Sequence, residues 1–434
     1  MGRRAIMQPM YTLGTRRQRS SPRRVLVLLI LIGAGVFVIV NQNQLRQDLT
    51  PPPTPTATRT ARSYVVEAES VFEAGNVPAT IDAYIQAVSL DPQNVEVLLK
   101  LSRLLILRGR TTDGLQYAER AAQAAPKDAP VQAALAMAYD WHASRLQQRG
   151  RNLEATDLYQ KAIATGKLAL TLDAKSADAH AYLAETYADL NSWESAIDHA
   201  QQALDLNPDR ADVQRAVAYV RESQGNYSGA IEAYERAILL APREVNLYVS
   251  LGQDYRILAN WQQALNAFER ATKIDPTSVA GFDELGWTYY LIEDFKQAEK
   301  ILEQAIQVDP TAWSPRSHLA ATYFVRKNYE DASTTFKTAI ELMNKDFDAD
   351  RYCVVAKSRA CDRAVTAYAT MAVSYCYLAE AYNDPGKYEQ EALPAFRRAL
   401  VIRPDDEGVL SNMDFCQIVM GKPPFRTPTP QPIK

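Results

Sequence analysis

Residues 245–278 read VNLYVSLGQDYRILANWQQALNAFERATKIDPTS, and this stretch holds the pattern of most of the chain in one copy. Its first half carries small and large apolar residues suited to one helix, and its second half carries a similar set suited to another. Pro276 ends the second half because a proline cannot continue a helix. The pattern predicts two antiparallel helices that approach closely at small residues, with aromatic rings filling the space between neighbouring pairs. The positions are Leu251, Gly252, Tyr255, Ala264, Phe268, Ala271 and Asp275.

Prolines repeat at a fixed interval along the chain. Pro92 and Pro126 are 34 residues apart, and the same interval separates successive members of the series Pro208, Pro242, Pro276 and Pro310. A period of this length is typical of a repeated helix-turn-helix unit. Two longer gaps, of 82 residues before Pro208 and 94 residues after Pro310, equal two periods with 14 and 26 residues added.

The same residue types recur in the other periods, and through them the chain resembles the tetratricopeptide-repeat (TPR) family. The resemblance implies an all-α fold, a right-handed superhelical solenoid whose units bury their apolar faces only by stacking. The matching positions are Leu285, Gly286, Tyr289, Ala298, Leu302 and Ala305; Leu183, Ala184, Tyr187, Ala196 and Ala203; Ala230, Tyr234 and Ala237; and Leu378, Ala379, Tyr382, Ala392, Phe396 and Ala399.

We expect about nine units between residues 61 and 406, followed by a capping helix and a Pro/Thr tail. The expected units are 61–94, 95–128, 129–176 with a 14-residue insert, 177–210, 211–244, 245–278, 279–312, 313–346 and 372–406; a second insert spans 345–371, the capping helix spans 407–420 and the tail spans 421–434.

The N-terminus predicts a membrane anchor. Val25–Val40 has no polar side chain, and residues 1–24 carry seven arginines and no acidic residue. We therefore expect a basic cytoplasmic tail, residues 1–24, and a transmembrane signal-anchor helix, residues 25–43. The arginines favour a single-pass protein in a bacterial-type cell membrane with the repeat body outside the cytoplasm. A cleaved signal peptide and a buried core helix are the alternatives.

Composition restricts the class of partner. Residues 44–60 are rich in Thr and Pro and predict an extended linker. The net charge is −3, so removing the seven N-terminal arginines leaves residues 25–434 at −10. An acidic body of this kind argues against binding to nucleic acid.

The first insert, around Asp140–Glu154, falls between the two helices of the third unit. It is long enough to extend each helix by about two turns at 3.6 residues per turn. The hairpin is then expected to project beyond its neighbours, with a basic tip that is either solvated or used for docking. The tip residues are Trp141, His142, Arg145, Arg149 and Arg151.

The second insert holds Cys353 and Cys361, while Cys376 and Cys416 lie on the helices that follow. Outside the cytoplasm an even number of cysteines predicts disulfides, and we favour Cys353 with Cys361 and Cys376 with Cys416. Eight residues of helix rise about 12 Å, too far for a disulfide, so the first pairing requires a bend. Separate buried thiols are the alternative, and the spacing does not suit zinc.

No catalytic, cofactor or metal motif is recognisable. The four histidines, His142, His180, His199 and His318, lie in different stretches without metal-ligand spacing or an adjacent nucleophile. Carboxylates such as Glu185 are most simply explained as parts of solvated helix faces. We therefore expect a protein that is not an enzyme and has no cofactor.

The resemblance implies a concave groove, lined by first helices, that receives a peptide or a partner helix. Aromatic and arginine residues are favoured at interface hot spots, although Trp287 and Phe324 could instead belong to the core. The Lys/Asn pairing with which some eukaryotic relatives bind a terminal carboxylate is absent, since Arg215 and Tyr219, and Val249 and Gln253, stand in its place. The expected groove residues are Arg215, Tyr219, Glu222, Asn246, Gln253, Arg256, Asp283, Trp287, Tyr290 and Phe324.

These observations predict a non-catalytic, membrane-tethered scaffold that binds a protein or peptide in the groove. The alternative is an accessory subunit of an envelope assembly or of a polysaccharide export or cell-wall machine. In that case Trp287, Tyr290 and Tyr219 would stack on a glycan.

Overall fold

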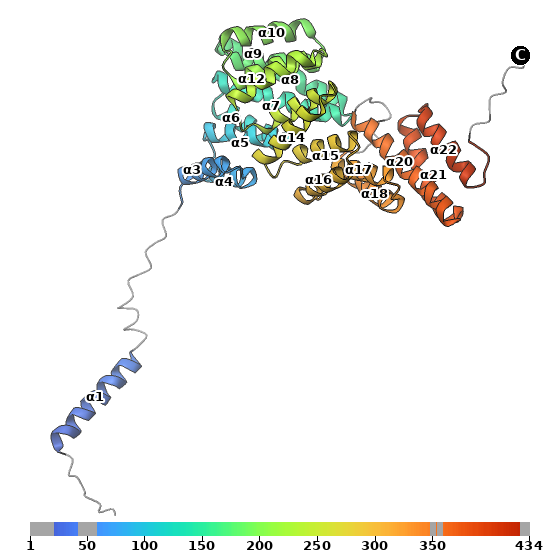
Figure 1. Cartoon of the computed structure of the whole chain (residues 1–434). Helices are drawn as coiled ribbons and strands as arrows, with labels where there is room; N and C mark the ends of the chain where they lie inside the picture. The colour runs from blue at the N-terminus through green and yellow to red at the C-terminus, as the bar shows by residue number, and fades with distance from the viewer. Residues whose placement is uncertain (1–20, 42–58, 348–352, 354–358, 426–434) are drawn as a thin grey trace, which may run out of the picture. The chain divides into compact units, whose positions relative to one another are not determined.

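The computed structural model describes residues 21–41, 59–347, 353 and 359–425. Over these ranges every regular element is an α-helix and there is no β-strand, which confirms the all-α prediction (Figure 1). The chain divides into two compact units, residues 1–59 and 60–434. The arginines of residues 1–20, most of the linker and the end of the Pro/Thr tail lie outside the described residues.

The first unit contains helix α1 (Pro22–Val40), which includes the whole apolar run. It has a mean hydropathy of 2.5 and no buried residue, and it is long and apolar enough to cross a membrane. A signal sequence has the same properties, so this helix fits both of the leading readings of the N-terminus.

The second unit is a succession of helix pairs in which each helix packs against the next and first helices also pack against first helices. The pairs of regular length join a helix of 13 residues to one of 14. They are α3 (Ala61–Glu73) and α4 (Val77–Leu90), α5 (Val95–Leu107) and α6 (Thr111–Ala124), α9 (Ala177–Asp189) and α10 (Trp193–Leu206), α11 (Ala211–Ser223) and α12 (Tyr227–Leu240), α13 (Val245–Ile257) and α14 (Trp261–Ile274), and α15 (Val279–Leu291) and α16 (Phe295–Val308).

The close approach of the two helices in a pair depends on small residues. Gly252 of α13 lies against the ring of Phe268 of α14, and a Cβ atom added there would come within 2.6 Å of the ring. Phe268 is fully buried, as is Leu302, which fills the same place against Gly286 in the next pair. The small-residue and large-residue positions predicted from the 34-residue period therefore face each other.

The third pair is longer than its neighbours. Helix α7 (Ala129–Gln148) has 20 residues and α8 (Asn152–Leu172) has 21, so the insert adds about two turns to each, as expected from its length. The expectation of a projecting, solvated tip is wrong for most of the side chains involved. Trp141 and Arg145 line a cavity, and Arg149 forms an ion pair with Asp346.

The C-terminal end departs from the period in another way. Helix α17 (Trp313–Val325) is regular, but α18 (Tyr329–Asp346), α20 (Arg359–Tyr382) and α21 (Pro385–Ile402) have 18, 24 and 18 residues, and α22 (Glu407–Val419) follows. The expected start of the last unit at residue 372 is too late, because α20 is already helical from Arg359. Part of the second insert is therefore the beginning of a long first helix.

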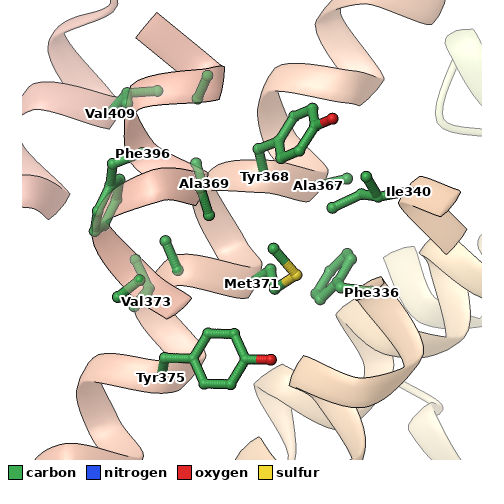
Figure 2. Close-up of a cluster of buried hydrophobic side chains, with 14 of the residues drawn as sticks. Phe336, Ile340, Ala367, Tyr368, Ala369, Met371, Val373, Tyr375, Phe396 and Val409 are labelled. Atoms are coloured by element: carbon green, nitrogen blue, oxygen red, sulfur yellow. The ribbon is translucent and has the colours of Figure 1, made fainter. Parts of the chain in front are cut away.

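A large apolar cluster holds this end together (Figure 2). Phe336 and Phe396 are 1 % and 0 % exposed, so each is sealed between helices. The labelled members come from four helices: Phe336 and Ile340 from α18, Ala367, Tyr368, Ala369, Met371, Val373 and Tyr375 from α20, Phe396 from α21 and Val409 from α22.

Candidate partner-binding cavity

A cavity of about 2400 Å³ is bordered mainly by the first helices of successive pairs. Its wall includes residues of α3, α5, α7, α9, α11, α13, α15 and α17, and α18 and α20 close one side. This is the concave side of the array, since first helices pack against one another along it.

Five of the ten predicted groove residues line this cavity and five do not. Those on the wall are Arg215, Tyr219, Asn246, Gln253 and Asp283; those elsewhere are Glu222, Arg256, Trp287, Tyr290 and Phe324.

The five residues away from the wall are engaged in contacts within the repeat body. Arg256 forms an ion pair with Glu284 at 2.6 Å, and Glu222 accepts a hydrogen bond from the Tyr234 hydroxyl. Trp287 stacks on Tyr290 and on His318, with ring centroids 4.6 and 4.3 Å apart. Phe324 packs against the C-terminal apolar cluster.

Arg215 is the centre of a buried charged cluster. Its guanidinium pairs with Glu185 at 2.8 Å and with Asp212 at 3.4 Å, and it lies 5.1 Å from the centre of the Trp141 ring. Burial raises the pKa of Glu185, an effect that the charge of Arg215 opposes. Burial would also raise the pKa of Asp212, but the charges of Arg103 and Arg215 outweigh burial and lower it. The sequence explanation of Glu185 as part of a solvated helix face is wrong, because it is 2 % exposed.

Next to this cluster lie two acidic residues in close proximity. The hydroxyls of Tyr159 and Tyr219 both donate to Asp189. Burial raises the pKa of Asp189 to about 6. Burial, followed by the charge of Asp189, raises the pKa of Asp140 well above its ordinary value. Burial therefore favours the protonated form of both carboxyl groups in the folded chain.

Several contacts cross the cavity between distant units. Arg103 of α5 pairs with Asp212 and Glu244, each at 2.9 Å, although these residues are 109 and 141 positions away. Arg108 contacts Asp275 and donates to the Thr277 carbonyl at 2.9 Å. The second repeat unit, residues 95–128, therefore touches the fifth and sixth repeat units, residues 211–278. Sequence periodicity did not indicate these pairs, because they link repeats that are not neighbours.

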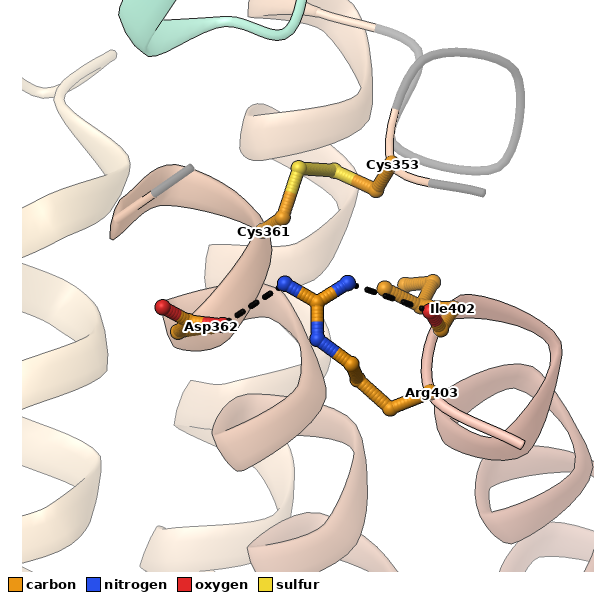
Figure 3. The surroundings of a disulfide bond; sticks show 5 residues. All are labelled: Cys353, Cys361, Asp362, Ile402 and Arg403. Atoms are coloured by element: carbon orange, nitrogen blue, oxygen red, sulfur yellow. Dashed lines mark hydrogen bonds and ion pairs between the residues drawn. A yellow bond between two sulfur atoms is a disulfide. The ribbon is translucent and has the colours of Figure 1, made fainter. Parts of the chain in front are cut away.

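Two disulfides lie at the C-terminal end. Cys353 is joined to Cys361, with Cα atoms 5.3 Å apart, and Cys376 of α20 is joined to Cys416 of α22, with Cα atoms 5.4 Å apart. Cys353 precedes α20 and Cys361 lies within it, so the two cysteines do not share one helix. Nearby, Arg403 donates to Asp362 at 2.8 Å and to the Ile402 carbonyl at 3.2 Å (Figure 3).

Two of the four histidines lie side by side, although they are 19 residues apart in the sequence. His180 and His199 face each other with Nδ1 atoms 2.9 Å apart, and Tyr187 stacks on His199. Burial lowers the pKa of both imidazoles. Within residues 21–41, 59–347, 353 and 359–425, no group of three or more His, Cys, Asp or Glu side chains is placed to hold a metal ion.

Comparisons with known proteins agree with this architecture. One family model, described as "Tetratricopeptide repeat", matches residues 71–138 and 293–351, and a second with the same description matches 142–211 and 183–245. No curated protein matches the chain.

Among solved structures, the chain is similar to a thermophilic TPR protein of Thermus thermophilus, with 22 % identity, 45 % of this chain and 98 % of that one covered, and a TM-score of 0.38. It is also similar to PilF of Pseudomonas aeruginosa, with 16 % identity, coverage of 54 % and 95 %, and a TM-score of 0.42. A third similar structure is yeast Tom70, with 15 % identity, coverage of 84 % and 89 %, and a TM-score of 0.39.

Proposed function

This chain belongs to the tetratricopeptide-repeat family, and we propose that it is a membrane-tethered scaffold that binds a protein or peptide partner in its concave cavity. Members of this family are typically non-catalytic interaction scaffolds, and the fold alone does not identify the partner. The observation that carries the proposal is the cavity of about 2400 Å³ between the first helices.

Amide side chains on the wall of the cavity support binding of a peptide rather than of a purely apolar ligand. Gln253 donates to Glu284 at 2.9 Å, and Asn246 donates to the Leu107 carbonyl at 2.9 Å. Both amides are only partly buried, and they could exchange these contacts for the backbone groups of a bound chain. Trp141, Trp313 and Tyr219 supply aromatic surface on the same wall.

Helix α1 supports the proposal of a membrane tether, and the disulfides support the proposal of a repeat body outside the cytoplasm. Every residue of α1 from Pro22 to Val40 is exposed, and so much apolar surface is stable in a bilayer rather than in water. The arginines before it favour a cytoplasmic N-terminus. Both disulfides agree with a body outside the cytoplasm, because disulfides persist in oxidising compartments.

The tether can be tested by placing charges in α1. Leu28→Arg with Ile32→Arg introduces two charges at the centre of the apolar run, and we expect the chain to move from the membrane fraction to the soluble fraction. Leu153→Arg is the matched control because Leu153 is 91 % exposed on the repeat body. In intact cells, added protease should cleave the wild-type body without permeabilisation. Protection until the membrane is opened would show the opposite orientation.

Binding in the cavity can be tested with a photo-crosslinking amino acid. We expect a probe at Gln253, on the cavity wall, to capture one defined envelope protein. The same probe at Gln262, an exposed position on α14, should not capture it. Equal capture from both positions would contradict the proposal.

The glycan alternative requires Trp287, Tyr290 and Tyr219 to stack on sugar rings. A glycan array on the wild-type chain and on Tyr290→Ala tests it directly. Glycan binding that is lost in this variant, together with no protein captured at Gln253, would replace the scaffold proposal with the glycan one.

A further inference from the structure

Arg145 is a cation without a partner on the cavity wall. It lies in the turns that the first insert adds to α7, and its Nε atom is buried without a hydrogen-bond partner. Over the described ranges its guanidinium forms no ion pair or hydrogen bond. The charges that act on it are those of Arg149, which follows the last residue of α7, and of Asp346 of α18, and that carboxylate is already paired with Arg149. Two arginines therefore share one carboxylate.

The other arginines on the wall have partners. Arg103 pairs with Asp212 and Glu244, and Arg215 pairs with Glu185 and Asp212. The remaining four also donate: Arg108 to Asp275, Arg110 to Asp113, Arg243 to Glu73 and Arg363 to Ser314. Among the arginines that the structure describes on this wall, Arg145 is the exception.

An unpaired cation in this position makes the free protein less stable. Burial and the charge of Arg149 lower the pKa of Arg145, but a guanidinium keeps its proton under all ordinary conditions. The cost of burying the charge can therefore be recovered only when an anion pairs with it.

We propose that Arg145 binds a carboxylate of the partner, so that the cavity selects a peptide segment with an acidic side chain or a free C-terminus. This inference rests on the proposed function and specifies the chemistry of the partner. Arg145, Arg149 and Asp346 together carry one net positive charge. A carboxylate of the partner carries one negative charge and would neutralise it. The planar guanidinium matches the carboxylate with two parallel hydrogen bonds.

Trp141 extends the site by one turn of α7. Its ring is partly buried on the same wall, beneath the guanidinium of Arg215, and its N–H donates to Glu185 at 3.3 Å. The ring can pack against the residues that flank the carboxylate. Because Trp141 and Arg145 belong to the first insert, the site is outside the 34-residue repeat pattern.

The test uses the full-length chain in detergent and fluorescence anisotropy of labelled peptides. The probes are a hexa-aspartate peptide with an amidated C-terminus, a hexa-asparagine peptide with a free C-terminus, and amidated hexa-asparagine as the uncharged control. Binding of the first probe identifies an acidic side chain as the ligand, and binding of the second identifies the terminal carboxylate.

We expect Arg145→Gln to weaken binding of the charged probe at least tenfold. Arg110→Gln, which removes a cavity arginine already paired with Asp113, should change it less than twofold. Equal losses of affinity in the two variants would show that the probe responds to the overall charge of the cavity and not to Arg145. That result would overturn the proposal. Absence of binding of both charged probes to the wild-type chain would also overturn it.

A second measurement separates binding from a structural role. Arg145→Met removes an unpaired charge, so we expect a higher Tm for the free variant, while the charged probe should raise the Tm of the wild-type chain only. A lower Tm in Arg145→Met would show that the arginine stabilises the fold instead. If Gln253 still captures the partner from Arg145→Gln at the wild-type level, this inference fails while the proposed function stands.

Discussion

The hairpin of α7 and α8 and the C-terminal end formed by α18, α20, α21 and α22 both break the 34-residue period, but they do so with opposite chemistry. The added turns of α7 bring Trp141 and Arg145 to the cavity, beside the buried ion pair of Arg215 and Glu185. The longer helices of the C-terminal end form an apolar cluster joined by two disulfides. An insertion can therefore add a polar surface at one place and a stable closure at another.

The contrast shows how a repeat array tolerates added residues. Each unit contacts mainly its neighbours, so an insert within a hairpin changes the length of two helices without changing the register of the next pair. Whether the added turns face the cavity or the core depends on which side of the hairpin carries apolar residues. The following experiments test the contrast, beginning with the largest effect.

The largest expected effect is removal of the disulfide between α20 and α22. Cys376→Ser with Cys416→Ser opens a loop of 40 residues and should lower the free energy of unfolding by about 4 kcal/mol. The matched control, Cys353→Ser with Cys361→Ser, opens a loop of 8 residues and should cost about 2.5 kcal/mol. Urea unfolding followed by circular dichroism measures both. Equal losses of unfolding free energy would show that loop entropy does not explain how the disulfides stabilise the C-terminal end.

The next effect concerns the polar region. Arg215→Gln leaves Glu185 and Asp212 without their shared buried cation and should cost about 3 kcal/mol in urea unfolding. Adding Glu185→Gln should recover part of this loss. Arg210→Gln, which breaks a more exposed pair with Asp178, is the control and should cost less than about 1 kcal/mol. If Arg215→Gln lowers the free energy of unfolding no more than the control does, the buried charged cluster does not stabilise the fold.

The polar region should also respond to pH. Burial raises the pKa of Asp189 from its ordinary value near 4 to about 6. The protonated form is therefore favoured in the folded chain, and its contribution is fully present below about pH 4 and is lost as pH rises through 6. Relative to Asp189→Asn, wild-type stability should fall by up to about 1.4 kcal/mol per pH unit over this window. Urea midpoints at pH 4, 5, 6 and 7 test this, and a constant difference would disprove it.

The smallest effect concerns the contact between the two regions. Arg149, which follows the last residue of α7, and Asp346 of α18 are both partly exposed, so Arg149→Gln should cost about 1 kcal/mol or less at low salt. In 1 M NaCl screening should remove most of the difference from the wild-type chain. A loss that does not depend on salt would point to packing rather than to charge.

Much of the fold was predictable because the period is local. Pro242 and Pro276 mark one unit, and Gly252 and Phe268 meet within it, so the residues that specify a pair lie close together in sequence. The extension of α7 and α8 followed from the length of the insert in the same way. The start of α20 at Arg359 could not be read from the period, because the second insert has no repeat positions to align.

The candidate site was predicted less completely. The repeat register selected Arg215 and Gln253, which line the cavity, but it also selected Trp287 and Phe324, which pack against other side chains of the body. The sequence indicates Arg145 only as part of the basic tip of the first insert. Its position on the cavity wall depends on how the third unit faces α18.

The helix pairs, their order and the apolar N-terminal run could all be read from the amino-acid sequence, since they depend on residue types at spacings of a few residues. Only the folded structure shows which charged side chains form ion pairs between distant units. Arg103 reaches Asp212 and Glu244, and Arg149 reaches Asp346, across more than a hundred residues. Such pairs depend on the curvature that accumulates over many units, and small rotations between neighbouring pairs leave no periodic signal in the sequence.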